Sequence, residues 1–174
     1  MEKRVKESSS QQVHVLTMSN LNGYNRLFGG QLLSWIDEVA AVVARRHSNH
    51  NVTTASIGML KFKKPAYANE TVVLKGQITY TGKTSMEVEV KTYVEKLNGE
   101  KILINEAYVI MVALDENEKP VEVPGLILEN EEEKNNWVLA LKRKEHRNSF
   151  HSDWHFFLFM LKYTYIIREE LKNV

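Results

Sequence analysis

The stretch GGQLLSWIDEVAAVVARRH, residues 29–47, decides the fold of this 174-residue chain. Its apolar residues recur at helical spacing, which places them on one face: Leu32, Leu33, Ile36, Val39, Ala40 and Val43. Gly29 and Gly30 stand at the start, where backbone N–H groups lack partners within the helix and a ligand atom can approach closely. We therefore predict one long helix from Gly29 to about His47 that packs its apolar face on another layer.

Four segments after this helix are rich in Val, Ile, Thr and Tyr, the residues that favour β-strands. They are Val52–Phe62, Glu70–Thr81, Thr84–Leu97 and Lys101–Leu114. Tight-turn sequences separate the last three strands and follow the fourth, namely Thr81-Gly82-Lys83, Asn98-Gly99 and DENEKP (115–120). Because such turns join antiparallel neighbours, these segments predict a long antiparallel meander.

The third and fourth strands differ in the character of their faces. In the third strand, apolar residues alternate with Glu87, Glu89, Lys91 and Glu95, which predicts that one face meets water. In the fourth, AYVIMVAL (107–114) is apolar on both faces, which predicts a central strand covered by the helix on one side and by another subunit on the other. One helix with an antiparallel sheet wrapped around it is an α+β fold.

Composition excludes several classes of protein. With 43% hydrophobic residues, 26% charged residues and a net charge of +1, the chain is typical of one globular domain and unlike a nucleic-acid binder, which needs a basic surface. It has no cysteine, which excludes a disulfide scaffold, a zinc finger and a cysteine nucleophile and favours a cytoplasmic location. Residues 1–12, MEKRVKESSSQQ, are polar and charged and predict a frayed, disordered tail rather than a secretory signal.

Two segments follow the predicted sheet. Charge runs from acidic to basic along residues 128–147, the order that complements a helix dipole, so we expect a surface helix over 127–147. Residues 148–174 form an apolar extension of unknown role, whose uninterrupted apolar run, Phe156–Leu161, is too short to span a bilayer. His151 and His155 lack the further ligands of a metal site, and no serine stands in a GxSxG pattern, so we expect neither a metal nor a serine nucleophile.

Asp37 lies at the border of the apolar face of the predicted helix, whereas Glu38 points toward solvent. The neighbours of Asp37 on the helix, Ala40, Ala41 and Ala44, are small, which leaves room beside the carboxylate for a substrate or a water molecule. Two interpretations are open from the helical wheel alone. Asp37 is either satisfied by a backbone or serine donor in the sheet, or it is a catalytic carboxylate.

Three sequence motifs follow one another along the chain, the first of which includes the start of the predicted helix. Residues 22–38 read NxxNxLFGGxLxxWxDE, residues 54–66 read TASIGMLKFKKPA, and residues 79–90 read TYTGKTSMEVEV, with VPGL following at 123–126. From about residue 13 to residue 126 the chain resembles the hotdog-fold acyl-CoA thioesterases of the bacterial YciA-like and brain acyl-CoA hydrolase type. The resemblance implies a hotdog domain over 13–126, an antiparallel sheet around one central helix, which agrees with the layers predicted above.

The resemblance also implies catalytic roles for individual residues. Asp37 matches the catalytic carboxylate, which acts as general base for water or, alternatively, as nucleophile. Asn22 matches the asparagine that shares the site, and Gly29 and Gly30 match the turn whose amides polarise the thioester carbonyl, with the Gly30 N–H as oxyanion donor. In such proteins the site lies between two subunits, and dimers commonly group into trimers, so a homo-oligomer is implied.

Further residues are candidates for binding the substrate, of which Thr54 and Ser56 stand at a position of the family pattern. Thr54 and Ser56 line the site or, alternatively, bond to the sheet, while contacts to coenzyme A phosphates fall to Lys63, Lys83, Thr84 and Ser85, with Lys61 and Lys64 as further candidates. A solvated surface is the simpler interpretation for each lysine. Asn25 and Arg26 depart from the family, which often has glycine and a small or polar residue there, so the entrance has a different shape or charge.

The function implied is hydrolysis of acyl-CoA to a free carboxylic acid and CoA, as part of fatty acid metabolism. A thioester is already activated, so an oxyanion site and a base suffice, and no cofactor is needed. The alternative is a non-catalytic acyl-CoA sensor on the same fold. A hotdog dehydratase is disfavoured because no histidine stands four or five residues after Asp37.

Overall fold

The structure, a computed structural model, describes residues 1–147. Met1–Asn136 form one compact unit, which holds the sheet and the long helix. Its elements in chain order are β1 (Glu2–Arg4), α1 (Val5–Ser8), β2 (Ser10–Val15), the 3₁₀ turn η1 (Met18–Asn20), α2 (Gly29–Ser48), β3 (Asn51–Phe62), β4 (Thr71–Thr81), β5 (Ser85–Glu95), β6 (Lys101–Leu114) and β7 (Gly125–Ile127). Residues 131–147 are helical, within the stretch expected to form a surface helix. The expected extension over 148–174, with its histidine pair, lies outside the described residues.

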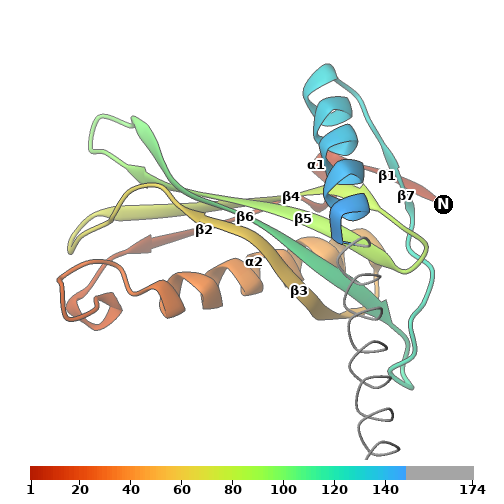
Figure 1. Cartoon of the computed structure of the whole chain (residues 1–174), viewed down its shortest axis with the longest axis horizontal. Coiled ribbons are helices and arrows are strands. Elements are labelled where there is room, and N and C mark those ends of the chain that lie inside the picture. The colour runs from red at the N-terminus through yellow and green to blue at the C-terminus, as the bar shows by residue number, and fades with distance from the viewer. Residues whose placement is uncertain (148–174) are drawn as a thin grey trace, which may run out of the picture. The chain divides into compact units, whose positions relative to one another are not determined.

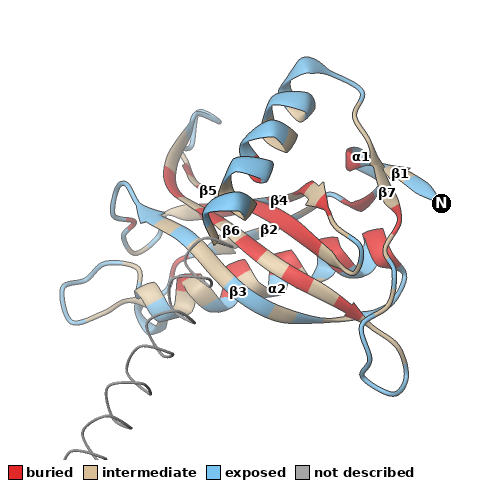
Figure 2. Ribbon diagram, turned by 45° about the vertical axis from the view of Figure 1, so that its right-hand side comes forward, coloured by how far each residue is buried: buried red, intermediate tan, exposed pale blue. Residues whose placement is uncertain are grey.

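The main sheet has five antiparallel strands in the order β2-β4-β5-β6-β3, and α2 packs on one face of it (Figure 1). The predicted helix is confirmed: α2 starts at Gly29 and ends at Ser48, where Asn49 adopts a left-handed conformation and caps it. Five of the six residues predicted for its apolar face are buried in the core, together with the inner residues of β4, β5 and β6 (Figure 2). The sixth, Leu33, is only half-buried and lies outside this core. The α+β class is therefore confirmed, and none of the described helices has the length and apolar character needed to cross a membrane.

The predicted four-stranded meander is only partly correct. The turns at 82–84 and 96–100 do join β4, β5 and β6 into antiparallel hairpins. However, β3 pairs with β6 at the far edge of the sheet, and the free side of β4 is taken by β2. No tight-turn sequence links β3 to β4, so the order of the strands in the chain does not determine the partner of β3. The sequence of β2, SQQVHV, is mostly polar and gives no strong sign of a strand that pairs with β4.

The expected disordered tail over residues 1–12 instead contains β1, α1 and the start of β2. β1 pairs in parallel with β7, and β2 pairs with β4. Lys3 Nζ donates to the Arg46 carbonyl (2.7 Å) and to Asn49 Oδ1 (2.9 Å), and Arg4 forms an ion pair with Glu129 (2.9 Å). The charges that suggested a solvated tail have partners far away in the sequence, which composition does not reveal.

His47, fully buried on α2, links the N-terminal segment to the end of the sheet. Its Nε2 lies 3.0 Å from the Pro124 carbonyl and its Nδ1 lies 3.3 Å from Ser8 Oγ. Because a carbonyl only accepts, Nε2 carries the proton and Nδ1 accepts from the Ser8 hydroxyl. The neutral imidazole thus satisfies both neighbours, and the cost of a second proton is the burial of a charged ring.

We expect His47 to make the fold sensitive to mild acid. Burial lowers the pKa of His47, opposed by the bond to Pro124, so the unfolded chain binds this proton first as the pH falls. The contribution of neutral His47 to the free energy of unfolding is fully present above about pH 6.5, the ordinary pKa of histidine. Below that pH the free energy of unfolding decreases by up to about 1.4 kcal/mol per pH unit, until His47 is protonated in the folded protein as well. Urea unfolding between pH 7.5 and 5 should show this slope. His47→Gln should reduce the dependence of the unfolding free energy on pH. The control His14→Gln, at another histidine whose pKa is lowered, should retain most of that dependence. An unchanged pH dependence in His47→Gln would show that His47 is not its source.

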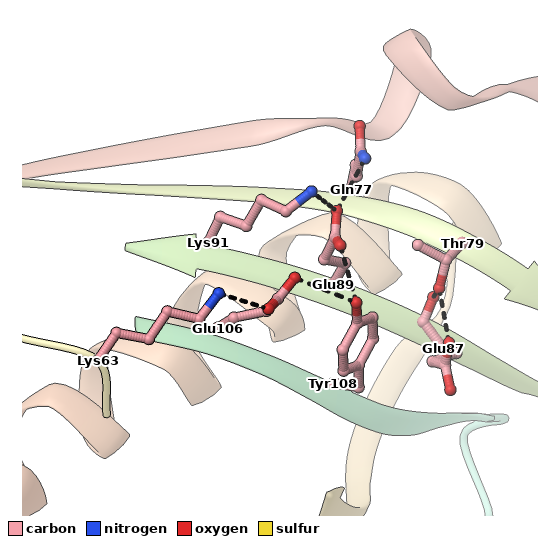
Figure 3. Close-up of polar contacts among 8 residues, drawn as sticks. All are labelled: Lys63, Gln77, Thr79, Glu87, Glu89, Lys91, Glu106 and Tyr108. Atoms are coloured by element: carbon pink, nitrogen blue, oxygen red, sulfur yellow. Dashed lines mark hydrogen bonds and ion pairs between the residues drawn. The ribbon is translucent and has the colours of Figure 1, made fainter. Parts of the chain in front are cut away.

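The prediction that one face of β5 meets water is wrong for its two central glutamates. Glu87 and Glu89 are 1% and 2% exposed. β5 is the middle strand, so long polar side chains of β4 and β6 flank it on both sides (Figure 3). Thr79 donates to Glu87 (2.8 Å), and Glu89 accepts from Gln77 (3.1 Å) and Tyr108 (3.1 Å) and pairs with Lys91 (3.0 Å). A buried carboxylate is tolerated when it is hydrogen-bonded in this way, and alternation alone cannot distinguish it from a solvated one.

β6 agrees better with the prediction. Its inner residues Ala107, Val109, Met111 and Ala113 are buried, and the residues between them are half-buried, including Tyr108 and Ile110 (Figure 2). The strand is an internal one, flanked by β5 and β3. The expectation of an apolar second face is thus met in part, and its covering by another subunit stays a prediction.

Candidate functional site

Asp37 lies on α2, half-buried, with one carboxylate oxygen held by the sheet. Thr54 Oγ1 on β3 donates to Asp37 Oδ1 at 2.5 Å and also lies 3.4 Å from Met111 Sδ. Oδ2 has no hydrogen-bond partner among the residues that the structure describes. Glu38, the next residue, is exposed, as the helical wheel predicted. It accepts a hydrogen bond from the Ser34 hydroxyl (3.2 Å). Both interpretations of Asp37 thus find support: a donor in the sheet holds one oxygen, and the other is open for a water molecule.

A β-bulge decides which neighbours of Thr54 face the helix. Thr54 pairs with Met111 and Ser56 pairs with Ile110, a shift of register by one residue. Met111 points into the core and Ile110 to the opposite face, so Ser56 is turned away from α2 and is exposed. Within one chain, the predicted pair of hydroxyls is therefore not brought together: Thr54 contacts Asp37 and Ser56 does not.

Asn22 organises the loop that leads into α2. Its Oδ1 accepts from the backbone N–H groups of Tyr24 (2.9 Å) and Arg26 (3.3 Å), and Asn25 adopts a positive φ of 55°. The same loop closes through the Asn22 N–H, which donates to the Arg26 carbonyl (2.8 Å). The asparagine thus sets the approach of the chain to the start of α2.

The start of α2 presents open backbone donors. Phe28 is the N-cap and supplies no side-chain bond, and the N–H groups of Gly29 and Gly30 have no acceptor within the described chain. A Cβ on Gly30 would lie 2.6 Å from the Phe28 ring, and one on Gly29 would lie 3.5 Å from the Phe62 ring. The two glycines therefore allow aromatic rings to pack against the helix start while its amides stay accessible. Such a terminus stabilises negative charge.

The candidate phosphate-binding residues fall in two places. Lys63 and Asn22 line the same surface cavity, at the end of β3. Lys83 and Thr84 lie in the β4–β5 turn, and Ser85 is the first residue of β5. They lie next to the row of paired residues across the sheet that contains Thr54, Met111, Met86 and Thr81. Phe62, next to Lys63, belongs to a different row, with Asn105, Thr92 and Leu74. Within one chain, Lys63 therefore lies away from the β4–β5 turn. In that turn, Lys83 forms an exposed ion pair with Glu122 (3.4 Å), which contributes little to stability.

Asn105 was not identified from the sequence, yet it shapes the end of β3. Its Nδ2 donates to the Lys61 carbonyl (3.0 Å) beside the second β-bulge, which precedes Phe62 and Lys63. Its Oδ1 and the Thr92 hydroxyl opposite it are buried without a protein partner in the described residues. A lone asparagine in the apolar strand KILINEAYVIMVAL was the available signal. No group of three or more His, Asp or Glu among residues 1–147 has a metal-binding arrangement.

Comparison with known proteins gives consistent matches. The family model of the thioesterase superfamily matches residues 24–100. YkhA of Bacillus subtilis, named an uncharacterized acyl-CoA thioester hydrolase, is 43% identical over 113 residues, which are 64% of this chain and 66% of that protein. A hexameric acyl-CoA thioesterase in its apo form is 39% identical, with a TM-score of 0.82 over 85% of this chain and 96% of the other.

A second solved structure contains ligands. The acyl-CoA hydrolase of Staphylococcus aureus, in complex with butyryl coenzyme A, coenzyme A and coenzyme A disulfide, is 30% identical, with a TM-score of 0.86 over 92% of this chain and 99% of the other. Further structures of that enzyme carry alanine in place of an asparagine, an aspartate and a threonine. The spacing of these three residues along that chain equals the spacing of Asn22, Asp37 and Thr54 here.

Proposed function

Since this chain belongs to the thioesterase superfamily, as a hotdog-fold acyl-CoA thioesterase, we propose that it hydrolyses acyl-CoA to a free carboxylic acid and CoA. The observation that carries the proposal is the half-buried carboxylate of Asp37, with Oδ1 held by Thr54 at 2.5 Å and Oδ2 open. The equal spacing of the substituted residues in the S. aureus enzyme supports the choice of Asn22, Asp37 and Thr54. The cytoplasmic location predicted from the composition belongs to the same proposal.

In the proposed reaction, Asp37 acts as the general base. Its Oδ2 accepts a proton from a water molecule, and the water oxygen attacks the thioester carbonyl carbon. The carbonyl oxygen becomes negatively charged and accepts a hydrogen bond from the Gly30 N–H at the positive end of α2. The C–S bond then breaks, and the CoA thiolate leaves and takes up a proton. Thr54 fixes the orientation of the carboxylate, so that its open oxygen points to the water.

The reaction is tested by the release of free thiol. We expect the purified chain to release CoA from acyl-CoA substrates of several chain lengths, detected with a thiol reagent. Binding without release would indicate the non-catalytic sensor instead. A single turnover in ¹⁸O-labelled water separates base from nucleophile: label in the product acid alone indicates attack by water, and label in Asp37 indicates a covalent anhydride.

We also infer that the complete site lies between two subunits. Thr54 is on β3, an edge strand whose outer backbone groups pair with no other strand in the described chain, and Asp37 contacts this strand directly. A second copy that pairs along β3 would therefore place its own residues beside Asp37. The hexameric state of a solved relative supports an oligomer.

Complementation tests this arrangement. We expect Asn22→Ala and Asp37→Asn to be inactive alone, because each removes one part of every site. When the two variants are co-expressed with different tags, mixed dimers regain one intact site if Asn22 and Asp37 come from different subunits, so a random mixture should show about a quarter of wild-type activity. If both residues act within one chain, the mixture stays inactive, which would contradict the shared site.

A further inference from the structure

Residues 61–66, which we call the β3 exit segment, contact the chain at the start of α2. The Leu27 N–H donates a hydrogen bond to the Ala66 carbonyl (2.8 Å). The Phe62 ring lies against the first turn of the helix, where a Cβ added at Gly29 would be in van der Waals contact with it, at 3.5 Å. The β3 exit segment therefore adjoins the helix start that carries the proposed oxyanion donor.

β6 holds the β3 exit segment in place through the backbone. Asn105 Nδ2 donates to the Lys61 carbonyl (3.0 Å). The Lys63 N–H donates to the Ile104 carbonyl (2.8 Å). The second β-bulge of β3 precedes these contacts, and in it Met59 adopts a positive φ of 49°, which costs free energy for a residue other than glycine. Such a conformation persists only where the surrounding structure fixes the chain, and β6 supplies those contacts.

One ion pair adds to these backbone bonds. Lys63 Nζ lies 3.0 Å from Glu106 Oε2, and both side chains are partly exposed (Figure 3). Glu106 Oε1 lies 3.3 Å from the Tyr108 hydroxyl, so the carboxylate has a contact on each side. A partly exposed ion pair contributes little to the free energy of unfolding. What it does determine is where the β3 exit segment lies relative to β6.

We propose that Glu106 is a positioning residue for the hydrolysis of acyl-CoA. Through its ion pair with Lys63 it fixes the β3 exit segment, which in turn holds the start of α2 where the Gly30 N–H meets the thioester oxygen. The inference rests on the proposed function and adds to it a residue that lies outside the cavity lined by Asn22. It also makes Lys63 a structural link and not a phosphate contact, because the adjacent carboxylate offsets its charge.

The test is Glu106→Gln, which removes the charge, keeps an oxygen for the Tyr108 hydroxyl and should leave the fold intact. We expect kcat for butyryl-CoA to fall about fivefold with KM within about twofold, because a displaced amide stabilises the transition state less while substrate binding is retained. Lys63→Gln should have the same effect. The double variant should be no slower than either single variant, since all three lose the same contact.

A matched control lies at the other end of β6. Lys101 forms an ion pair with Glu95, also at 3.0 Å and partly exposed, close to the β5–β6 turn. This pair does not contact the β3 exit segment, so Lys101→Gln should change neither kcat nor KM. A fall in kcat equal to that of Glu106→Gln would mean that any lost ion pair of the sheet has this effect, and would overturn the inference.

Glycine amide signals report the position of the helix start without turnover. The chain has eight glycines, so protein labelled with ¹⁵N-glycine gives at most eight amide signals in a nitrogen–proton correlation spectrum. In Glu106→Gln we expect the signals of Gly29 and Gly30 to shift and that of Gly99, in the β5–β6 turn, to stay. Lys101→Gln should show the reverse pattern.

Unchanged signals of Gly29 and Gly30 in Glu106→Gln, or an unchanged kcat, would overturn the inference. So would a rise in KM in Lys63→Gln that Glu106→Gln does not share, because Lys63 would then bind the substrate directly. The failure of the proposed function is seen separately, as an absence of thiol release by the wild-type chain. If the two glycine signals still shift in that case, the positioning of the helix start by Glu106 is supported and the proposed hydrolysis alone is contradicted.

Discussion

Replacing Asp37 by asparagine is expected to lower kcat for acyl-CoA hydrolysis at least about 100-fold, because removal of a general base typically costs that much. The amide cannot take a proton from water, but its oxygen still accepts the hydrogen bond from Thr54, so the geometry in the wild-type structure is retained. KM should change little, because Asp37 does not contribute to binding the CoA moiety in the proposed reaction. Steady-state kinetics with butyryl-CoA measure both constants.

The control for this substitution lies one residue away. Glu38 is exposed on α2 and bonds to Ser34 and Gln12, so Glu38→Gln should keep near-normal hydrolysis. Equal melting temperatures for the two variants would show that any difference in rate is chemical. If Asp37→Asn retained more than about a tenth of wild-type kcat while folded, Asp37 would not be the base, and its role would be reduced to the structural contact with Thr54.

The parts of the fold that sequence reasoning predicted are those encoded locally. The spacing of apolar residues in α2 and the turn residues on both sides of β5 act over a few positions, and these elements appear where they were expected. The parts that it missed depend on distant partners. β2 becomes a strand because β4 offers it an edge, and β3 crosses to β6 although no local signal in the sequence specifies that pairing.

The candidate site divides in the same way. The half-buried position of Asp37 follows from the helical wheel, because it depends only on the angle between residues of one helix. The separation of Thr54 from Ser56 does not, because a bulge of a single residue reverses the face on which every later side chain lies. Likewise, the burial of Glu89 depends on Gln77 and Tyr108 from neighbouring strands, which the period of β5 does not reveal.

Gly76 on β4 controls how closely the sheet approaches α2. It is buried, and a Cβ there would lie 2.6 Å from Val39 Cγ1 and 3.0 Å from Val43 Cγ2, which is closer than real contacts allow. Both valines are fully buried and β-branched, so they have little freedom to turn away. We expect Gly76→Ala to lower the free energy of unfolding by about 1–3 kcal/mol, the usual cost of overpacking a core. Urea unfolding monitored by circular dichroism measures this change.

A double-mutant cycle separates close packing from other effects of the alanine. Val39→Ala alone should destabilise the protein by leaving a cavity, whereas Val39→Ala together with Gly76→Ala should be less destabilised than the sum of the two, because the new methyl group occupies the vacated space. The single Gly76→Ala variant should also lose activity, since moving α2 away from β4 alters the contact of Asp37 with Thr54. If the effects of the two substitutions on stability were strictly additive, α2 and β4 would not be closely packed at this point. If Gly76→Ala also hydrolysed acyl-CoA normally, the position of Asp37 would be set elsewhere along the helix.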